Sequence, residues 1–179
     1  MSIKDVLIVG AGAAGSSAAF HLANKGISVS LLEKNQQPNP KPCGGGMASS
    51  VQQWFPFEMK SIVEDVIKTV EFTWNLSDPV VADLSDYEPF WIVRREKLDL
   101  FLQNKAINAG VELIKPFKVN KINKEKELWK ISSEDGRYVE GKTLIIADGS
   151  NSPWPKVFNL GPKKQRHAST LSIRLKGKG

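Results

Sequence analysis

VLIVGAGAAGSSAA, residues Val6 to Ala19, joins a short apolar run to a glycine turn that is followed by small residues. The run Val6–Val9 is typical of a buried parallel strand, because it is short, branched and uninterrupted. The small residues from Gly15 onward predict a helix, and Gly26 is well placed to end it. Val29–Leu32 predicts a second strand, so this part of the chain has the order of a strand–helix–strand unit of about 30 residues.

The glycines of this turn have the spacing of a phosphate-binding motif. Gly10, Gly12 and Gly15 fit the pattern GxGxxG, directly after one predicted strand and at the start of a predicted helix. Gly10 allows the tight turn, Gly12 leaves room for a pyrophosphate, and Gly15 lets helix and strand pack closely. The free N–H groups and the positive end of the helix then face the phosphates.

An acidic residue follows the second predicted strand. Glu33 comes 18 residues after Gly15, where a carboxylate accepts hydrogen bonds from the ribose hydroxyls and repels a 2′-phosphate. The alternative is a tight strand-to-helix turn followed by an exposed acidic residue. Because the glycines, strand, helix and carboxylate are all in register, we favour a site for the adenosine diphosphate half of a dinucleotide.

The remaining sequence predicts a loop, a long helix and a set of short strands. NQQPNPKPCGGG, residues 35–46, contains too much proline and glycine for a helix or a central strand. RREKLDLFLQNKAINAG, residues 94–110, predicts a helix that Gly110 ends. The turn EDGR predicts a hairpin within a three-stranded meander. The other predicted elements are a short helix near Ala48–Trp54, strands at Val70–Trp74, Val80–Leu84, Phe117–Ile122, Leu128–Ser132 and Arg137–Glu140, a buried run TLIIADGS at 143–150, and a final strand STLSIRL at 169–175.

Composition narrows the class of protein. Hydrophobic residues make up 41% and charged residues 25% of the 179 residues, which allows a sizeable core. No apolar run approaches the roughly 20 residues of a membrane-spanning helix, and Asp5 interrupts the first apolar stretch too early for a signal peptide. The single cysteine excludes an internal disulfide framework and favours a reducing compartment. The net charge of +6 suits phosphate-bearing ligands or an anionic bilayer, but its lysines are spread along the chain and do not indicate nucleic acid.

The order of the later elements favours FAD over a nicotinamide dinucleotide. A nicotinamide domain normally continues with another helix and a parallel strand, whereas here a Pro/Gly loop, a distant helix, a meander and LIIADGS follow. This order resembles the FAD-binding domain of the para-hydroxybenzoate hydroxylase-like flavoproteins. KPCGGG, residues 41–46, and ADGSNSPWPK, residues 147–156, are most similar to the geranylgeranyl reductase family, whose members reduce isoprenoid double bonds. The resemblance runs from about Ile3 to the last residue.

The resemblance implies fourteen FAD-binding positions. The glycine turn would surround the pyrophosphate, and the acid after the second strand would bind the adenosine ribose. The residue after this acid is also among the implied positions. A cysteine and glycine loop would pass near the flavin, and an arginine would approach the phosphate or ribityl region. A backbone group of the first meander strand would read the adenine edge, and an Asp-Gly pair would lie near the FAD linker. In that order, the positions are Gly10, Gly12, Ala14 and Gly15; Glu33 and Lys34; Cys43, Gly44, Gly45 and Met47; Arg95; Val119; and Asp148 and Gly149.

Several of these positions have an alternative explanation. Asp148 follows a buried strand at the carboxyl end of the sheet, where open α/β folds bind ligands, but an aspartate in an ordinary turn is the alternative. Arg95 is either a forked phosphate donor or the partner of Asp99 at i,i+4, a pair worth only about 0.3–0.5 kcal/mol when exposed. Cys43 is either a thiol near the flavin or a small residue that lets the loop fold. The sequence assigns no catalytic residue and contains no metal-ligand cluster.

The implied activity is that of an FAD-dependent oxidoreductase which takes electrons from NAD(P)H and reduces an isoprenoid or lipid-like substrate through a flavin hydride. Two alternatives stay open, an aromatic-ring monooxygenase on the same scaffold and a non-catalytic nucleotide-binding module. The surface charge and the lipid-like substrate predict a cytoplasmic protein that contacts a membrane peripherally.

The predicted domain organisation is incomplete. We predict an FAD-binding domain over residues 1–160, with an inserted segment of about 48–92 on the substrate side, and the start of a truncated substrate domain over 161–179. The second Gly-Asp segment that completes the flavin site in the family is not found. We therefore expect an N-terminal fragment of a longer reductase, or a truncated gene product that needs a partner.

Overall fold

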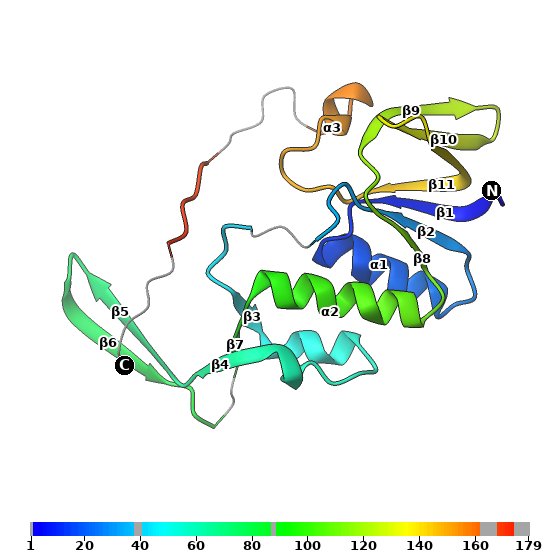
Figure 1. Ribbon diagram of the computed structural model, residues 1–179. Coiled ribbons are helices and arrows are strands. Elements are labelled where there is room, and N and C mark those ends of the chain that lie inside the picture. The colour runs from blue at the N-terminus through cyan, green and yellow to red at the C-terminus, as the bar shows by residue number, and fades with distance from the viewer. Residues whose placement is uncertain (1, 38–40, 87–88, 162–167, 174–179) are drawn as a thin grey trace. The chain divides into compact units, whose positions relative to one another are not determined.

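A computed structural model describes residues 2–37, 41–86, 89–161 and 168–173, which belong to two compact units (Figure 1). The first unit comprises residues 1–39 and 99–168, and the second comprises 40–98 and 169–179. The predicted inserted segment, 48–92, falls within the second unit. Its assignment to a substrate domain stays a prediction.

The first unit is built on a six-stranded sheet with the order β8-β2-β1-β11-β10-β9. Neighbouring strands from β8 to β11 are parallel, and β10 and β9 complete the sheet as an antiparallel meander with β11. The strand predicted before the glycine motif, the strand predicted after the following helix and the predicted meander are therefore confirmed. The strand bounds are β1 Lys4–Val9, β2 Val29–Leu32, β8 Glu112–Ile114, β9 Val119–Glu125, β10 Leu128–Ser133 and β11 Tyr138–Ile146.

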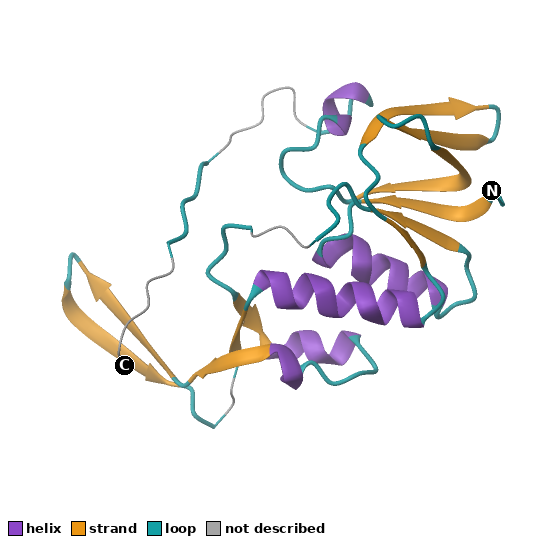
Figure 2. Ribbon diagram, in the orientation of Figure 1, coloured by secondary structure: helices purple, strands orange, loops and turns teal. Residues whose placement is uncertain are grey.

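Helices α1 (Ala13–Ala23) and α2 (Arg95–Asn108) cover one side of the parallel strands, and the meander lies on the other side (Figure 2). Helix α1 buries its small residues and Phe20, and α2 contributes the buried residues Leu102 and Ala106 to this unit. A short helix, α3 (Trp154–Val157), follows β11. The core on the meander side consists of Leu7, Val9, Leu32, Phe117, Ile122, Ile131, Val139 and Trp154.

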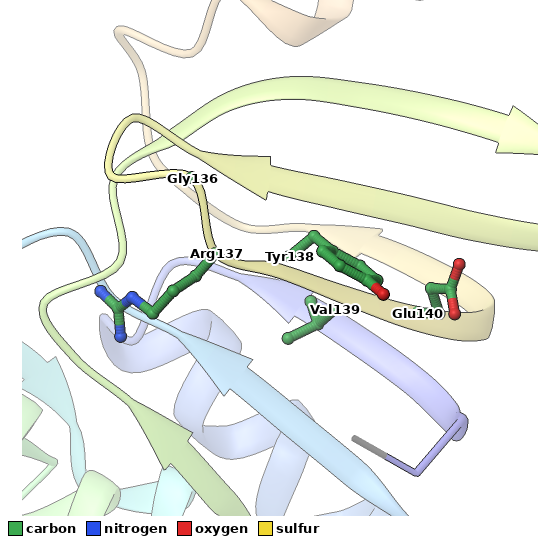
Figure 3. Close-up of a pocket in the computed structure, with 5 residues that line it drawn as sticks. All are labelled: Gly136, Arg137, Tyr138, Val139 and Glu140. Carbon is green, nitrogen blue, oxygen red and sulfur yellow. The ribbon is translucent and has the colours of Figure 1, made fainter.

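Strand β11 corrects the predicted boundary between the meander and the run TLIIADGS. The sequence predicts two strands there, but the structure contains one, in which Gly141 pairs with Trp129 of β10 and also with Lys4 of β1. The ribbon turns back after Glu140 (Figure 3). A Cβ on Gly141 would lie 2.6 Å from Cγ of Leu7, so a glycine is needed where one strand serves both partners.

Two further predictions about strands are wrong. Residues 112–114 form β8, a third strand parallel to β2 that directly follows α2. The chain therefore does contain another helix and another parallel strand after β2. These are the two elements that the sequence analysis expects of a nicotinamide domain and not of this chain. Residues 169–173 of the expected final strand STLSIRL have no regular secondary structure, and residues 174–175 lie outside the described part of the chain.

The second unit contains two small antiparallel sheets. One has the strand order β3-β7-β4, with β3 at Gly46–Ala48, β4 at Val63–Ile67 and β7 at Phe90–Val93. The other is the hairpin of β5 (Thr69–Trp74) and β6 (Ser77–Asp83), which confirms two predicted strands within a few residues. The predicted short helix is a 3-10 helix over Ser49–Trp54, and a second one covers Lys60–Ile62.

Candidate functional site

The glycine turn is held between the ends of three strands. The N–H of Gly10 donates to the carbonyl of Leu32 at 2.8 Å, and the N–H of Ala147 donates to the carbonyl of Val9 at 2.8 Å. Gly10 has a φ of 99°, and a Cβ there would lie 2.5 Å from the carbonyl oxygen of Ala147. Both its backbone conformation and its packing against the end of β11 therefore require glycine.

Helix α1 begins directly after this turn. Gly12 is its N-cap, and the first helical hydrogen bond runs from the N–H of Ser16 to the carbonyl of Gly12 at 2.9 Å. A Cβ on Gly15 would lie 1.8 Å from the carbonyl oxygen of Gly10, so only glycine lets the helix start this close to β1. By helix geometry, the N–H groups of residues 12–15 have no acceptor inside the helix, and they carry its positive end.

Glu33 points at the glycine turn. Its Oε2 accepts a hydrogen bond from the N–H of Ala11 at 3.0 Å, and its Oε1 accepts one from the N–H of Asn35 at 3.0 Å. The side chain is half-buried, and each carboxylate oxygen retains a second acceptor site. The acid predicted to bind a ribose is therefore fixed beside the start of α1.

Two residues that the sequence analysis missed contact the same turn. Nε2 of Gln103, on α2, donates to the carbonyl of Ala11 at 2.7 Å, and Oγ of Ser16 donates to the same carbonyl at 3.1 Å. Both side chains are buried. A sequence signal for Gln103 does exist, since Gln103 shares a helix face with the buried Ala106, where an apolar residue is expected.

Asp148 and Gly149 follow β11 beside the turn. A Cβ on Gly10 would lie 2.7 Å from the Cα of Asp148, which places this aspartate against the first glycine. Gly149 has a φ of 97°, but a Cβ there would meet nothing within 4 Å. Its backbone conformation is therefore what favours glycine within this chain.

Unpaired buried polar atoms mark this region. Among the described residues, the buried side-chain nitrogen and oxygen atoms without a hydrogen-bond partner are Oε1 of Gln103 and Oδ1 of Asp148. Such atoms are rare, because leaving a buried polar group unpaired costs about 1–3 kcal/mol. Both belong to residues that lie beside Gly10 and Ala11, so the unpaired atoms gather at the glycine turn.

The predicted adenine and ribose positions lie on neighbouring segments of this unit. Val119 is half-buried at the start of β9 and pairs with Ser133. The N–H of Phe117, two residues earlier, donates to the backbone carbonyl of Glu33 at 2.7 Å, which ties the start of β9 to the segment that carries the acid. Lys34 is exposed in the bend after Glu33.

The other predicted positions belong to the second unit or to the start of α2. Cys43 is exposed, and its Sγ accepts a hydrogen bond from the N–H of Gly45 at 3.4 Å. Gly45 has a φ of 79°, and a Cβ there would lie 2.2 Å from the carbonyl oxygen of Val93. Packing against β7 therefore already explains this glycine. Gly44 is exposed, Met47 lies in β3, and Arg95 is the first residue of α2.

A pocket of about 250 Å³ lies along the first part of β11 and is lined by residues 136–140 (Figure 3). None of the predicted site residues lines it. At its rim, Nη2 of Arg137 pairs with Oδ2 of Asp135 at 2.6 Å, and this contact holds the pKa of Asp135 well below its usual range. Arg137 is thus paired with Asp135, and the pocket carries no assignment.

The described residues fit half of a dinucleotide. The N–H groups at the start of α1 suit a pyrophosphate, Glu33 suits a ribose, and the unpaired carboxylate oxygen of Asp148 offers an acceptor at the carboxyl end of the sheet. Among the same residues, no helix has the length and apolar character needed to cross a bilayer. They also include no group of three metal-ligating side chains. Fold and site together define a Rossmann-like α/β domain of the dinucleotide-binding class.

Comparison with known proteins identifies the family. The model of the pyridine nucleotide-disulphide oxidoreductase family matches residues 4–172, and the chain belongs to this family of FAD-dependent oxidoreductases. Its fold is the α/β FAD-binding domain with a small antiparallel sheet, as the sequence predicted.

Two curated relatives are similar to most of this chain. An uncharacterised protein of Methanosarcina barkeri is 31% identical over 89% of this chain, and protein FixC of Escherichia coli K-12 is 32% identical over 97% of it. The chain spans 41% and 42% of the length of these two curated relatives.

Two solved structures share the fold at lower identity. A geranylgeranyl bacteriochlorophyll reductase-like protein from Thermoplasma acidophilum has a TM-score of 0.71 at 24% identity, over 83% of this chain and 40% of its own. Halogenase PltM in complex with phloroglucinol and FAD has a TM-score of 0.71 at 19% identity, over 87% of this chain and 36% of its own. At these identities, the likeness concerns the fold alone.

Proposed function

We propose that this chain is the FAD-binding part of a reductase of the geranylgeranyl reductase type, which uses NAD(P)H to reduce isoprenoid double bonds. The observation that carries the proposal is the glycine turn with Glu33 turned onto the N–H of Ala11. The motifs KPCGGG and ADGSNSPWPK favour this reductase type over other flavoproteins. The FixC relatives, of which the chain spans less than half, do not decide the substrate.

The residues of the first unit would hold the cofactor by its nucleotide half. The N–H groups at the start of α1 would bind the pyrophosphate, Glu33 would accept from the adenosine ribose, and Asp148 would accept from a hydroxyl of the ribityl linker. FAD, when bound, supplies the electron-transfer chemistry that side chains lack. The part of the protein described here would therefore bind and orient the cofactor, and we assign it no catalytic residue.

A titration of the purified chain with FAD tests the binding role. A matched pair of variants places a new carboxylate at either end of the same helix, with Ala14→Glu at the exposed first turn and Asn24→Glu at the exposed C-cap. An acid in the first turn complements the helix dipole, so Ala14→Glu should keep the protein folded and yet repel a phosphate. We expect FAD affinity to fall about tenfold or more in Ala14→Glu and to stay within a factor of two or so in Asn24→Glu.

Turnover distinguishes the proposal from its alternatives. Anaerobic bleaching of bound FAD by NADPH, with saturation of a prenyl chain, would support the reductase. Oxygen consumption that a phenol stimulates would favour a monooxygenase, and FAD binding without reduction would favour a nucleotide-binding module. If wild type and both variants fail to bind FAD and ADP, the proposed function is wrong.

A further inference from the structure

We infer that Gln103 is a positioning residue for the nucleotide-binding turn, and this inference rests on the proposed function. Gln103 lies on α2, 92 positions from Ala11 in the sequence, and its Nε2 donates to the carbonyl of Ala11 at 2.7 Å. Only 4% of the residue is exposed. Among the described residues, the other side-chain hydrogen bonds to the turn come from nearer in the sequence, since Ser16 lies on α1 itself and Glu33 follows the next strand.

The contact sets the direction of one peptide group. A trans peptide is planar, so the carbonyl of Ala11 and the N–H of Gly12 point in opposite directions. The carbonyl points at two buried side chains, Gln103 and Ser16. The N–H of Gly12, at the N-cap of α1, is therefore directed away from them. It is the first of the N–H groups that would bind a pyrophosphate.

The backbone N–H and the backbone carbonyl of Ala11 form hydrogen bonds with different parts of the fold. Its N–H donates to Glu33, which follows β2, and its carbonyl accepts from Gln103 on α2. Because Ser16 moves with α1, its hydrogen bond does not fix the turn relative to the rest of the unit. Gln103 supplies that external anchor on the carbonyl side, and rigid support of this kind lowers the ordering cost of ligand binding.

The carbonyl oxygen of the Gln103 side chain indicates that this residue serves function and not folding stability. Oε1 of Gln103 is buried without a hydrogen-bond partner among the described residues, and an unpaired buried acceptor destabilises a protein. A side chain of similar shape without polar atoms would avoid this cost, while Ser16 would still pair with the carbonyl of Ala11. Gln103 therefore provides an orientation of the turn at the expense of folding stability.

The test compares Gln103→Met, which keeps the length of the side chain and removes its donor, with Asn104→Met, a control at the adjacent exposed position. In Gln103→Met we expect ADP and FAD affinity to fall about three- to tenfold, the net worth of one hydrogen bond, while the melting temperature stays equal or rises. Asn104→Met should change neither affinity. A loss of stability that accompanies the loss of affinity would indicate a merely structural role and would overturn the inference, as would unchanged affinity.

A measurement without ligand separates this inference from the proposed function. In the ligand-free chain, the ¹H–¹⁵N cross-peak of Gly12 should be single in wild type and in Asn104→Met. In Gln103→Met it should broaden or split, because the peptide group loses its external anchor. An unchanged Gly12 peak in Gln103→Met contradicts the inference even if no nucleotide binds. If wild type binds ADP and Gln103→Met binds it equally well, the proposed function stands and the inference fails.

Discussion

The carboxylate of Glu33 accepts a hydrogen bond from the backbone N–H of Ala11, with 3.0 Å between Oε2 and the nitrogen. This contact fixes an acid from the end of β2 inside the turn that starts α1. Because Oε1 is also bonded, to the N–H of Asn35, the carboxylate has one orientation. Its remaining acceptor sites therefore have fixed directions beside the start of α1.

Glu33→Gln should weaken ADP binding and change its selectivity. Hydrogen bonds to a charged group contribute about 1.5–3 kcal/mol, so ADP affinity should fall roughly ten- to a hundredfold. The neutral amide no longer repels a 2′-phosphate, so the preference for ADP over 2′-phospho-ADP should shrink. Calorimetric titration with both nucleotides measures this. An unchanged preference would show that Glu33 does not face the ribose.

Asp148→Asn should weaken the binding of FAD and leave the binding of ADP unchanged. Oδ1 of Asp148 is buried and has no hydrogen-bond partner among the described residues. The proposed function puts this side chain at the ribityl linker, which ADP lacks. FAD affinity should therefore fall about tenfold while ADP affinity stays the same. Parallel titrations with FAD and ADP measure the two affinities. An equal loss of affinity for both ligands would indicate that Asp148 contacts the nucleotide half of FAD and not the ribityl linker.

Gly15→Ala should destabilise the first unit. The added Cβ would lie 1.8 Å from the carbonyl oxygen of Gly10, so helix and strand must separate, whereas a Cβ on Gly44 meets nothing within 4 Å. We expect the free energy of unfolding to fall by about 1–3 kcal/mol or more in Gly15→Ala, and by much less in the control Gly44→Ala. Urea denaturation measures both values. Equal effects would mean that the close packing at Gly15 is not needed.

Acid should weaken the link between β1 and β11. Hydrogen bonds from Lys142 and Ser28 hold the pKa of Asp5 well below its ordinary value of 3.8. A lowered pKa in the folded state gives stability that is complete above the unfolded value and is lost as pH falls through the folded value. The free energy of unfolding should therefore decline below about pH 4 more steeply in wild type than in Asp5→Asn. Lys142→Met should flatten the decline in the same way, and identical slopes in all three proteins would contradict this assignment.

The strand–helix–strand unit could be predicted because its signals are local. The apolar run, the glycines and Glu33 all lie within residues 6–33, and short-range sterics decide what they form. Strand β8 is not predicted because it has only three residues and begins two positions after Gly110. The junction in β11 was misjudged because Gly141 serves two partner strands, which depends on contacts far apart in the chain.

The candidate site was predictable only at positions where the expected ligand calls for a particular residue type. The glycine turn and Glu33 lie together as expected, whereas Gly45 is explained by its contact with Val93 in the second unit. Gln103 was missed because its target is a backbone carbonyl 92 positions away. No local pattern indicates such a contact, although a polar residue on a buried helix face is the signal to search for.

The most direct test of the central claim is an ADP titration of the ¹⁵N-labelled chain, followed through its backbone amides. If the start of α1 binds the diphosphate, the largest shifts should occur at the amides of residues 11–15, and they should saturate with one equivalent of ADP. Shifts confined to other parts of the chain, or no saturable shift at these amides, would contradict the account.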